Sequence, residues 1–426
     1  MKTICFNLNI HRASRLKKYD FFDIGHNNFY FDDIAVQTES EQRNRDFVFP
    51  MFDVLMSLIE KYGSAFRFSI TVSGIVLELV ERYYPEMLGR YREFFDTGCV
   101  EFVGMPYNCS LSSITDMDEF CHQVKKHSAE LQRLIGAKPT SFRNTELIYT
   151  DKIGLAAYDM GFDTVLAEGV GTGLDSRGPG FVYFNPLQPR QHVITRNVSI
   201  SRILEDSLKE IKIFTPDYFV SKLYDFDDDD DDNGDIVYLG LNFEQMDGTK
   251  GNREQVPQFV KEVIESTIES GKFEFLTVGE ASRKYQPVAP YHVVEPVSGM
   301  TRKHDLSPWQ GNELQKEALR KITALGALVK TANNDTLTDI WERLQTSDYF
   351  YFMSTDNLDY KPNQFKSPYD AFITYMNIID DLTRRVDEKI EKKHAENMSE
   401  QQIKDVISFY EKEIVSLRRK LLDKDE

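Results

Sequence analysis

The stretch KPTSFRNTELIYTDKIG, from Lys138 to Gly154, indicates the fold class of this chain. Its pattern predicts a short buried strand at residues 140–142, which ends in the polar residues Arg143, Asn144 and Glu146. The carboxyl ends of the strands carry the chemistry of an α/β barrel, so a carboxylate at this position marks a candidate site. From these residues alone, the alternative is that Arg143 and Glu146 form an ion pair on a surface loop.

Segments on both sides of this stretch alternate between strand and helix patterns. Apolar alternation and short apolar runs predict strands at residues 3–11, 66–72, 99–103, 140–142, 164–167, 181–184, 193–196, 235–241 and 273–277. Apolar residues at helical spacing predict helices at residues 46–62, 75–93, 118–135, 153–160 and 254–270. Strands that alternate with helices over about 280 residues form a parallel sheet, and a barrel is the simplest way to close it.

The chain changes character after residue 287. Apolar residues at helical spacing predict four further helices, at residues 310–331, 335–347, 368–393 and 400–422. A chain of 426 residues has room for a barrel of about 250 residues and a second domain. We therefore predict a barrel domain at residues 1–290 and a C-terminal helical domain at residues 291–426.

The composition narrows the classes of partner. Lysine and arginine number 51 and aspartate and glutamate 69, so the formal net charge is −18, and this charge repels a phosphate backbone. No nucleic-acid partner is therefore expected. The hydrophobic content of 41% is enough for a sizeable core. No stretch approaches the ~18 apolar residues of a membrane span, and the N-terminus reads as a strand rather than a signal peptide.

Three further groups of residues could suggest a cofactor or metal site, but we expect none of them to bind one. Gly169, Gly171 and Gly173 resemble a phosphate-binding loop, but no Lys-Ser/Thr pair follows and no helix opens there, so they form a flexible loop. The run from Asp227 to Asp232 lacks the spacers and closing glutamate of a calcium loop and is expected to be a solvated surface loop. The cysteines show no CxxC spacing and are expected to be reduced thiols of a cytoplasmic protein; they are Cys5, Cys99, Cys109 and Cys121.

The string FRNTELIY around Glu146 resembles the nucleophile region of the α-amylase-type members of glycoside hydrolase family 57. In the same order along the chain, VEFVGMPYNCSLSS resembles the second motif of that family and YLGLNFEQMDG resembles the fourth. Three later strings, HDLSPWQGNELQKEA, IWERLQTSDYFYFMSTD and SPYDAFITYMNIIDD, resemble its C-terminal segments. The resemblance implies an incomplete (β/α)7 barrel followed by a helical domain, with an α-glucan or maltooligosaccharide as the partner.

The resemblance places Glu146 at the nucleophile position of the family. A retaining glycosidase also needs a second carboxylate, which acts first as an acid and then as a base. The aspartate that serves this role in the family falls on Asn242, and an amide has no proton to give near neutral pH. Asp247 and Glu244 are the candidates for a relocated acid. Substrate-binding roles are expected for His11, Tyr107, Arg143, Glu244 and Trp309.

Other motif positions also depart from the family pattern. His11 is followed by Arg12 and Ala13, where the family usually has Gln-Pro. Residues 105–109 read MPYNC where the family has Glu-Thr-Tyr-Tyr-His, and residues 298–301 read SGMT where it has Ser-Trp-Ala-Asp. The combined loss of these polar groups suggests that the site no longer hydrolyses glucans.

Three functional hypotheses follow, and the oligomeric state stays open. In the first, the chain is a catalytically impaired amylase-like scaffold whose groove still binds sugars or a partner. In the second, it is an active retaining hydrolase or transglycosylase that uses Glu146 with Asp247 or Glu244. In the third, it is a structural or regulatory protein without affinity for sugars. We predict that four residues converge at one barrel mouth because each follows a strand. They are His11, Tyr107, Glu146 and Asn242.

Overall fold

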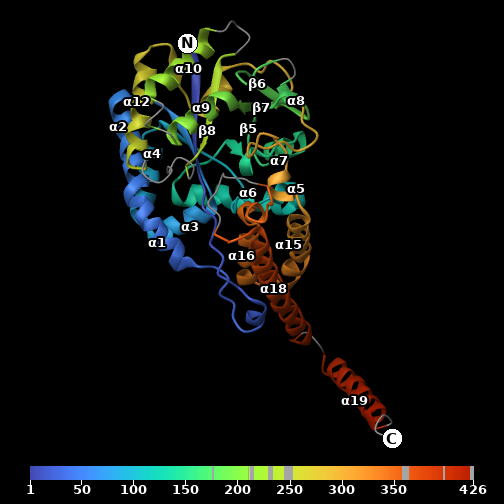
Figure 1. Cartoon of the computed structure of the whole chain (residues 1–426). Helices are drawn as coiled ribbons and strands as arrows, with labels where there is room; N and C mark the ends of the chain where they lie inside the picture. Colours follow the sequence, from blue (N-terminus) through green and yellow to red (C-terminus); the bar gives the residue numbers. More distant parts are fainter. Residues whose placement is uncertain are drawn as a thin grey trace.

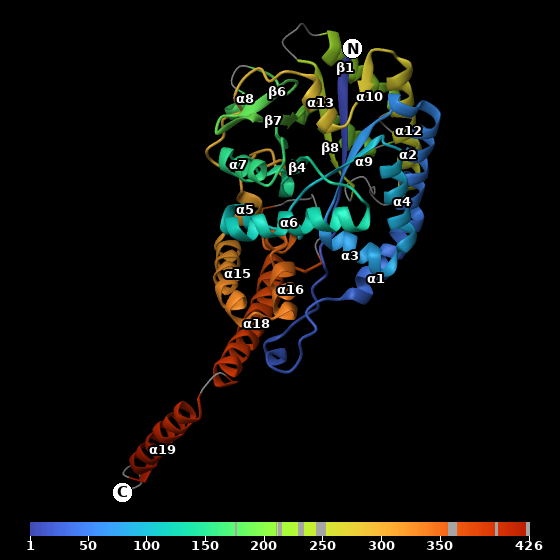
Figure 2. The ribbon, with the colours of Figure 1, turned by 180° about the vertical axis from the view of Figure 1, so that it is seen from behind.

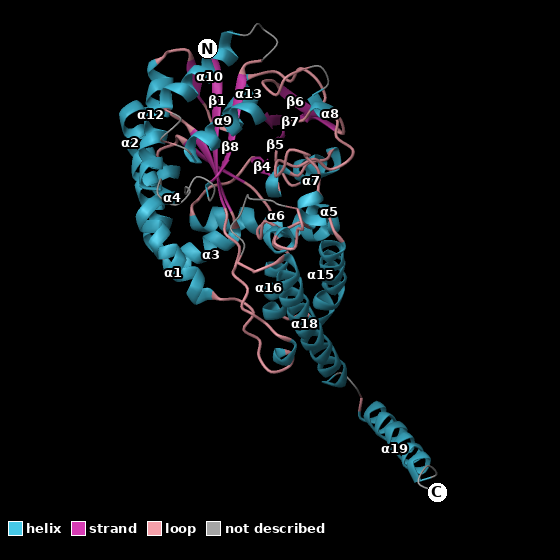
Figure 3. Ribbon diagram, viewed as in Figure 1, coloured by secondary structure: helices cyan, strands magenta, loops and turns pink. Residues whose placement is uncertain are grey.

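The computed structural model of the chain places a set of strands inside a layer of helices (Figure 1, Figure 3). It describes residues 1–174, 177–209, 211, 215–228, 234–243, 253–356, 364–396 and 399–422. The described strands are β1 Lys2–Ile10, β2 Phe68–Val72, β3 Val100–Val103, β4 Ser141–Arg143, β5 Thr164–Glu168, β6 Val182–Asn185, β7 Gln188–Arg196, β8 Ile236–Asn242 and β9 Phe273–Phe275.

The strands form one sheet that rolls up into a nearly closed parallel barrel. Neighbours follow the order β3, β2, β1, β8, β7, β5 and β4, and each of these pairings is parallel. Gly104, directly after β3, closes the ring against β4. Its backbone N–H donates to the carbonyl of Ser141 and its carbonyl accepts from the N–H of Arg143, both at 2.9 Å. The predicted (β/α)7-type barrel is therefore confirmed, and two further strands lie off this order, β6 paired with β7 and β9 paired with β1.

Both faces of β1 are buried, as expected for a strand whose sheet is covered by helices. Its outward side chains, at positions 4, 6, 8 and 10, pack against the helical layer. Its inward side chains include Asn7 and Asn9, which are 0% and 4% exposed. Asn7 Nδ2 donates to Oγ1 of Thr71 on β2 at 3.2 Å. Because buried amides need partners, these residues give the barrel interior a polar, hydrogen-bonded lining.

Helices cover the outside of the barrel. They are α1 Asp33–Arg43, α2 Phe49–Tyr62, α3 Gly74–Tyr83, α4 Pro85–Asp96, α5 Ser112–Thr115, α6 Met117–Leu134, α7 Asp151–Asp159, α8 Gly171–Leu174, α9 Val198–Lys209, α10 Pro216–Asp228, α12 Val256–Glu269 and α13 Val278–Lys284. One apolar cluster joins α2, α3, α4, α9, α10 and α12 to the outward faces of the strands. Figure 2 shows α2, α4 and α12 together along one side of the barrel.

Two local predictions are wrong. The sequence predicts one helix at 75–93, but the structure has two, α3 and α4, because Tyr84 leaves the helical conformation (φ −134°, ψ 60°) before Pro85. The glycine loop, where no helix is expected, contains the one-turn helix α8. A further departure from the alternating rhythm is that β6 and β7 pair as an antiparallel hairpin.

The chain after residue 306 is helical, as predicted. Its helices are α14 Ser307–Gln310, α15 Glu313–Ala332, α16 Asp335–Leu344, α17 Ser347–Tyr351, α18 Pro368–Glu396 and α19 Glu400–Leu422. Trp341 of α16 is 2% exposed, and its Nε1–H donates to the carbonyl of Ile322 at 2.8 Å. A Cβ on Gly326 would lie 2.6 Å from the Trp341 ring, so glycine permits the close approach of α15 and α16. Figures 1 and 2 show α15, α16 and α18 at one end of the barrel, with α19 beyond them.

The helical region docks on the end of the barrel where the parallel strands finish. The N–H of Ser347 donates to the carbonyl of Cys109 at 3.1 Å, and the hydroxyl of Tyr349 donates to the carbonyl of Ser14 at 2.7 Å. Ser14 follows β1 and Cys109 follows β3, so α17 bridges two strand ends. The boundary between residues 290 and 291 stays a prediction. None of the described helices is long and apolar enough to cross a membrane.

Gly104→Ala tests how the barrel is closed. A Cβ at this position would lie 2.5 Å from the Phe162 ring, which must move away from the contact between β3 and β4. We expect the free energy of unfolding to fall by about 1–3 kcal/mol, as in other overpacked cores. Chemical denaturation measures this change. The matched control is Gly89→Ala in α4, where a Cβ meets nothing within 4 Å and helix propensity improves by up to ~1 kcal/mol. Equal midpoints for both variants would contradict this account of closure.

Candidate active site

Glu146 lies in a strained turn directly after β4. This turn is a short 3-10 helix, Thr145–Leu147, in which Glu146 and Leu147 have left-handed φ values of 45° and 57°. Such conformations cost on the order of 1–3 kcal/mol in residues other than glycine and persist only where the surroundings fix them. Asn144 fixes this one, because its Oδ1 accepts from the N–H of Thr145 and its Nδ2 donates to the carbonyl of Ile148, both at 2.9 Å. Glu146 is therefore held rigidly, with 5% of its surface exposed.

Glu146 and Asn242 are in contact although 96 residues separate them. Asn242 ends β8, and its Nδ2 donates to Oε2 of Glu146 at 3.4 Å, which is long for a hydrogen bond. Its Oδ1 accepts from Nδ2 of Asn9, the residue opposite it on β1, at 2.7 Å. A chain of amide donors therefore runs from Asn9 through Asn242 to the carboxylate. The sequence analysis did not single out Asn9; its position on the inward face of β1 is the signal that points to it.

The direction of these hydrogen bonds follows from the chemistry of the Glu146 carboxylate. An ionised carboxylate only accepts hydrogen bonds, so Asn242 must turn its NH₂ group toward Glu146 and its oxygen toward Asn9. In this orientation, Asn242 has the shape and the donor of a protonated aspartic acid. It differs in the property that proton transfer requires, because its amide does not titrate near neutral pH.

The structure adds two charged residues, Glu168 and Arg196, at the same end of the barrel. Glu168 ends β5 and Arg196 ends β7, and Nε and Nη2 of the arginine donate to the two carboxylate oxygens at 2.9 and 3.1 Å. Both side chains are buried. Burial alone would lower the pKa of Arg196, but the charge and hydrogen bonds of Glu168 raise it. Glu146 was selected because it is a charged residue at the carboxyl end of a strand. The same criterion, applied to β5 and β7, selects Glu168 and Arg196.

Gly299 lies between Glu146 and Glu168. Its N–H donates to the carbonyl of Glu146 at 2.9 Å, and a Cβ on it would lie 2.7 Å from Oε2 of Glu168. His304, on the same loop with φ of 54°, has its Nδ1 3.6 Å from Oε1 of Glu168. The buried carboxylate leaves no space for a side chain at residue 299, where the resemblance leads us to expect tryptophan.

His11 follows β1 and forms a second buried cluster. Its Nδ1 lies 2.9 Å from Oγ of Ser73, and its Nε2 lies 3.1 Å from Oδ2 of Asp348 on α17. Burial lowers the pKa of His11, but Cys109 and Asp348 outweigh it and raise the pKa to about 10. The imidazole is therefore protonated at neutral pH, and it forms an ion pair that ties α17 to the barrel.

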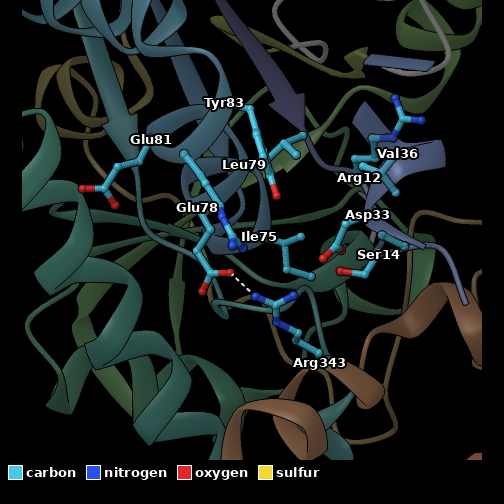
Figure 4. Close-up of a pocket in the computed structure, with 12 residues that line it drawn as sticks. Arg12, Ser14, Asp33, Val36, Ile75, Glu78, Leu79, Glu81, Tyr83 and Arg343 are labelled. Atoms are coloured by element: carbon cyan, nitrogen blue, oxygen red, sulfur yellow. Dashed lines mark hydrogen bonds and ion pairs between the residues drawn. The ribbon is translucent and has the colours of Figure 1, made fainter. Parts of the chain in front are cut away.

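A surface hollow of about 300 Å³ lies beyond the ends of β1 and β2, and Arg12, the residue after His11, is among those that line it (Figure 4). Its walls come from the segment after β1, from α1 and α3, and from Arg343 at the end of α16. Figure 4 shows Arg343 reaching across to Glu78, whose Oε2 accepts from Nη2 at 2.7 Å. Tyr107 donates its hydroxyl to the other oxygen of Glu78 at 2.8 Å. Tyr107 therefore supports the wall of this hollow.

Arg143 and Trp309 occupy buried positions. Arg143 is 4% exposed, and within the described part of the chain its Nε has no hydrogen-bond partner. Burial raises the pKa of Tyr238 to about 12, and the positive charge of Arg143 acts in the opposite direction. Trp309 of α14 is 1% exposed and packs in the core that the helical region shares with β4 and β5. Their roles in substrate binding stay predictions.

Several predicted features fall outside the residues that the structure describes. They are Asp247, Glu244 and the aspartates 229–232 of the acidic run. Within the described ranges, no group of three His, Cys, Asp or Glu residues is placed to hold a metal ion. All four cysteines are free thiols.

The barrel and its helical region define an α/β-barrel protein with buried charged residues at the carboxyl ends of its strands. Residues 5–294 match Glycosyl hydrolase family 57, and this match covers more than half of the chain. The chain therefore belongs to glycoside hydrolase family 57. A putative alpha-amylase from Methanocaldococcus jannaschii is 24% identical over 437 residues, which cover 96% of this chain and 90% of the relative.

Two solved structures have the same architecture. A branching enzyme of this family from Thermococcus kodakaraensis superposes with a TM-score of 0.68 at 13% identity, over 95% of this chain and 93% of that one. The 4-alpha-glucanotransferase from Thermococcus litoralis superposes with a TM-score of 0.65 at 13% identity, over 90% of this chain. The chain spans only 60% of the glucanotransferase. At these identities, the likeness establishes the (β/α)7 barrel with its helical C-terminal region.

The ion pair between His11 and Asp348 predicts how stability changes with pH. The pKa of His11 is about 10 in the folded protein against an ordinary value of 6.5. Its contribution to stability is therefore complete below pH 6.5 and is lost as the pH rises toward 10. We expect Asp348→Asn to lower the free energy of unfolding most below pH 6.5 and progressively less at higher pH. Denaturation over this pH range measures the difference between the two proteins.

The control for this experiment is Asp380→Asn, because Asp380 is exposed. This variant makes the same chemical change without touching His11, so its stability should track that of the unmodified chain at every pH. A deficit of Asp348→Asn that stays constant across the pH range would contradict a raised pKa for His11.

Proposed function

We propose that this protein is a family 57 scaffold for α-glucans or maltooligosaccharides in which hydrolysis is impaired. The observation that carries the proposal is the contact between Glu146 and the amide of Asn242. Support for the ligand class comes from the relatives, which are named as an alpha-amylase, a branching enzyme and a 4-alpha-glucanotransferase. Glu146 takes the nucleophile position in this proposal, and Asn242 takes that of the acid and base.

Retaining hydrolysis requires a proton at two moments. One carboxylate attacks the anomeric carbon while a second group protonates the leaving oxygen, and that group then takes a proton from water. Asn242 can do neither, because its amide neither releases nor accepts a proton near neutral pH. Loss of general acid and base catalysis lowers the rate by about 10²- to 10⁴-fold. This factor corresponds to roughly 3–5 kcal/mol of barrier.

The position of Asn242 suits the second group of a retaining pair. Its Nδ2 and Oε2 of Glu146, the hydrogen-bonding atoms of the two side chains, are 3.4 Å apart. Asn9 holds the amide in this position through its hydrogen bond to Oδ1 of Asn242. In this proposal the site therefore keeps a polar group opposite Glu146 and lacks only the proton that a carboxylic acid would supply.

Restoring the acid is the direct test of this function. The unmodified chain is expected to release little or no reducing sugar from starch or maltooligosaccharides, and Asn242→Asp is expected to restore part of the activity. The aspartate keeps an oxygen for Asn9 and adds a titratable proton. Its repulsion from Glu146 raises one of the two pKa values, which favours the protonated form that catalysis needs. Restoration stays partial if residues 105–109 and 298–301 stabilise the transition state poorly.

Two variants control this experiment. Asn9→Asp makes the same amide-to-acid change one strand away and should restore nothing. Asn242→Asp combined with Glu146→Gln should lose whatever Asn242→Asp gains. Robust hydrolysis by the unmodified chain, abolished by Asp247→Asn or Glu244→Gln, would instead establish an active enzyme with a relocated acid. Calorimetry with maltooligosaccharides distinguishes these two hypotheses, an impaired scaffold and an active enzyme, from the third. A structural or regulatory protein without affinity for sugars would show no binding.

A further inference from the structure

The helix α19 lies apart from the body of the protein. Figures 1 and 2 show it extending beyond the end of α18, away from the barrel. Every described side chain from residue 399 to residue 420 is exposed. The helix is nonetheless rich in large apolar residues. Their exposed fractions are 41% for Ile403, 39% for Val406, 52% for Ile407, 62% for Phe409, 60% for Tyr410, 49% for Ile414, 51% for Val415 and 54% for Leu417.

Most of these apolar residues follow a heptad. Spacings of four, three, four and three residues separate Ile403, Ile407, Tyr410, Ile414 and Leu417. This is the alternation of d and a positions that forms the seam of a coiled coil. The stripe from Ile403 to Leu417 covers 15 residues, or about two heptads. The helix has 23 residues and is roughly 35 Å long.

The a positions of the stripe match the pattern of two-stranded coiled coils. They hold the β-branched residues Ile407 and Ile414, and the d positions hold Ile403, Tyr410 and Leu417. β-branched residues at a with leucine at d favour parallel dimers over larger assemblies. Of the d positions only Leu417 fits this pattern, so the choice of two strands rests on the a positions and on the flanking charges. Pairing with a second helix would remove this exposed apolar stripe from water.

The flanking charges select the same arrangement. In a parallel pair, position g of one helix faces position e of the next heptad of its partner, so Glu413 faces Arg418 of the second copy in two symmetric ion pairs. In a fully overlapped antiparallel pair, e faces e and g faces g. That arrangement would set Lys404 against Arg418, and Glu413 against Glu413. Like charges in these positions oppose association, so charge complementarity favours the parallel pair.

We propose that α19 is a dimerisation helix that forms a parallel two-stranded coiled coil with α19 of a second copy of this chain. In this dimer, the two barrels lie at the same end of the coil. The proposal rests on α19 alone and is independent of the function of the barrel.

The mass of the full chain in solution tests the dimer. Light scattering coupled to gel filtration should give about twice the chain mass of 49.5 kDa. Ile407→Lys combined with Ile414→Lys should return the mass to that of one chain, because two charges enter the seam. The matched control is Phe409→Lys combined with Val415→Lys, which places the same charges outside the a and d positions and should leave the dimer intact. Circular dichroism checks that all variants keep the fold.

Charge reversal tests the orientation. Arg418→Glu should weaken the parallel dimer, because Glu413 then faces a second carboxylate, and the further change Glu413→Arg should restore it. In a fully overlapped antiparallel dimer, Arg418→Glu would strengthen association, because Lys404 would gain an opposite charge. Tyr410→Cys adds an independent readout, since a parallel pair brings the two copies of residue 410 together and oxidation should cross-link them. Ser408→Cys, on the outer face of the helix, should not cross-link.

Three outcomes would overturn the proposal. The first is a chain that stays monomeric at every accessible concentration. The second is a dimer that survives the combined Ile407→Lys and Ile414→Lys substitutions, since its interface would then lie elsewhere. The third is a monomer that sediments with vesicles of anionic lipid through α19, which would make it a membrane-surface helix instead.

Discussion

The hydrogen bond between a neutral amide and a buried carboxylate sets the chemistry of this barrel. Glu146 is almost fully enclosed, and Asn242 offers it a donor that carries no charge. A second carboxylate at residue 242 would repel Glu146, and one of the two would have to hold a proton near neutral pH. That shared proton is what a retaining glycosidase uses. The amide of Asn242 carries neither the charge that would cause this repulsion nor a proton that it could transfer near neutral pH.

The rest of the fold holds this pair in place. Asn9 fixes the amide from β1, and Asn144 fixes the turn that carries Glu146. The helical region docks on the same end of the barrel through His11 and Asp348. Left-handed residues other than glycine gather there, at positions 109, 146, 147 and 304. Backbone strain of this kind is typical of functional sites, and here it includes Glu146 itself.

The architecture could be predicted from the sequence because the spacing of apolar residues along a segment shows which of its faces is buried. The strand before Glu146, the alternation with helices and the helical C-terminal region could all be predicted. The charged pair of Glu168 and Arg196 could also have been predicted, because both residues end strands, as charged site residues of a barrel do. The contact of His11 with Asp348 was not, because it joins residues 337 positions apart and depends on how the helical region docks. Asn9 was not singled out, although its place near the carboxyl end of β1, on the face opposite the apolar residues of that strand, is a signal that could have found it.

The central claim is that Glu146 remains a competent nucleophile that lacks its acid and base. Intact mass spectrometry after incubation with an α-maltosyl fluoride tests it most directly, because fluoride leaves without being protonated. The account predicts a covalent maltosyl adduct that accumulates on Glu146, since no base activates the water that would release it. The adduct should be absent from Glu146→Gln. Rapid release of maltose with no adduct would show that another residue serves as acid and base, and would contradict the account.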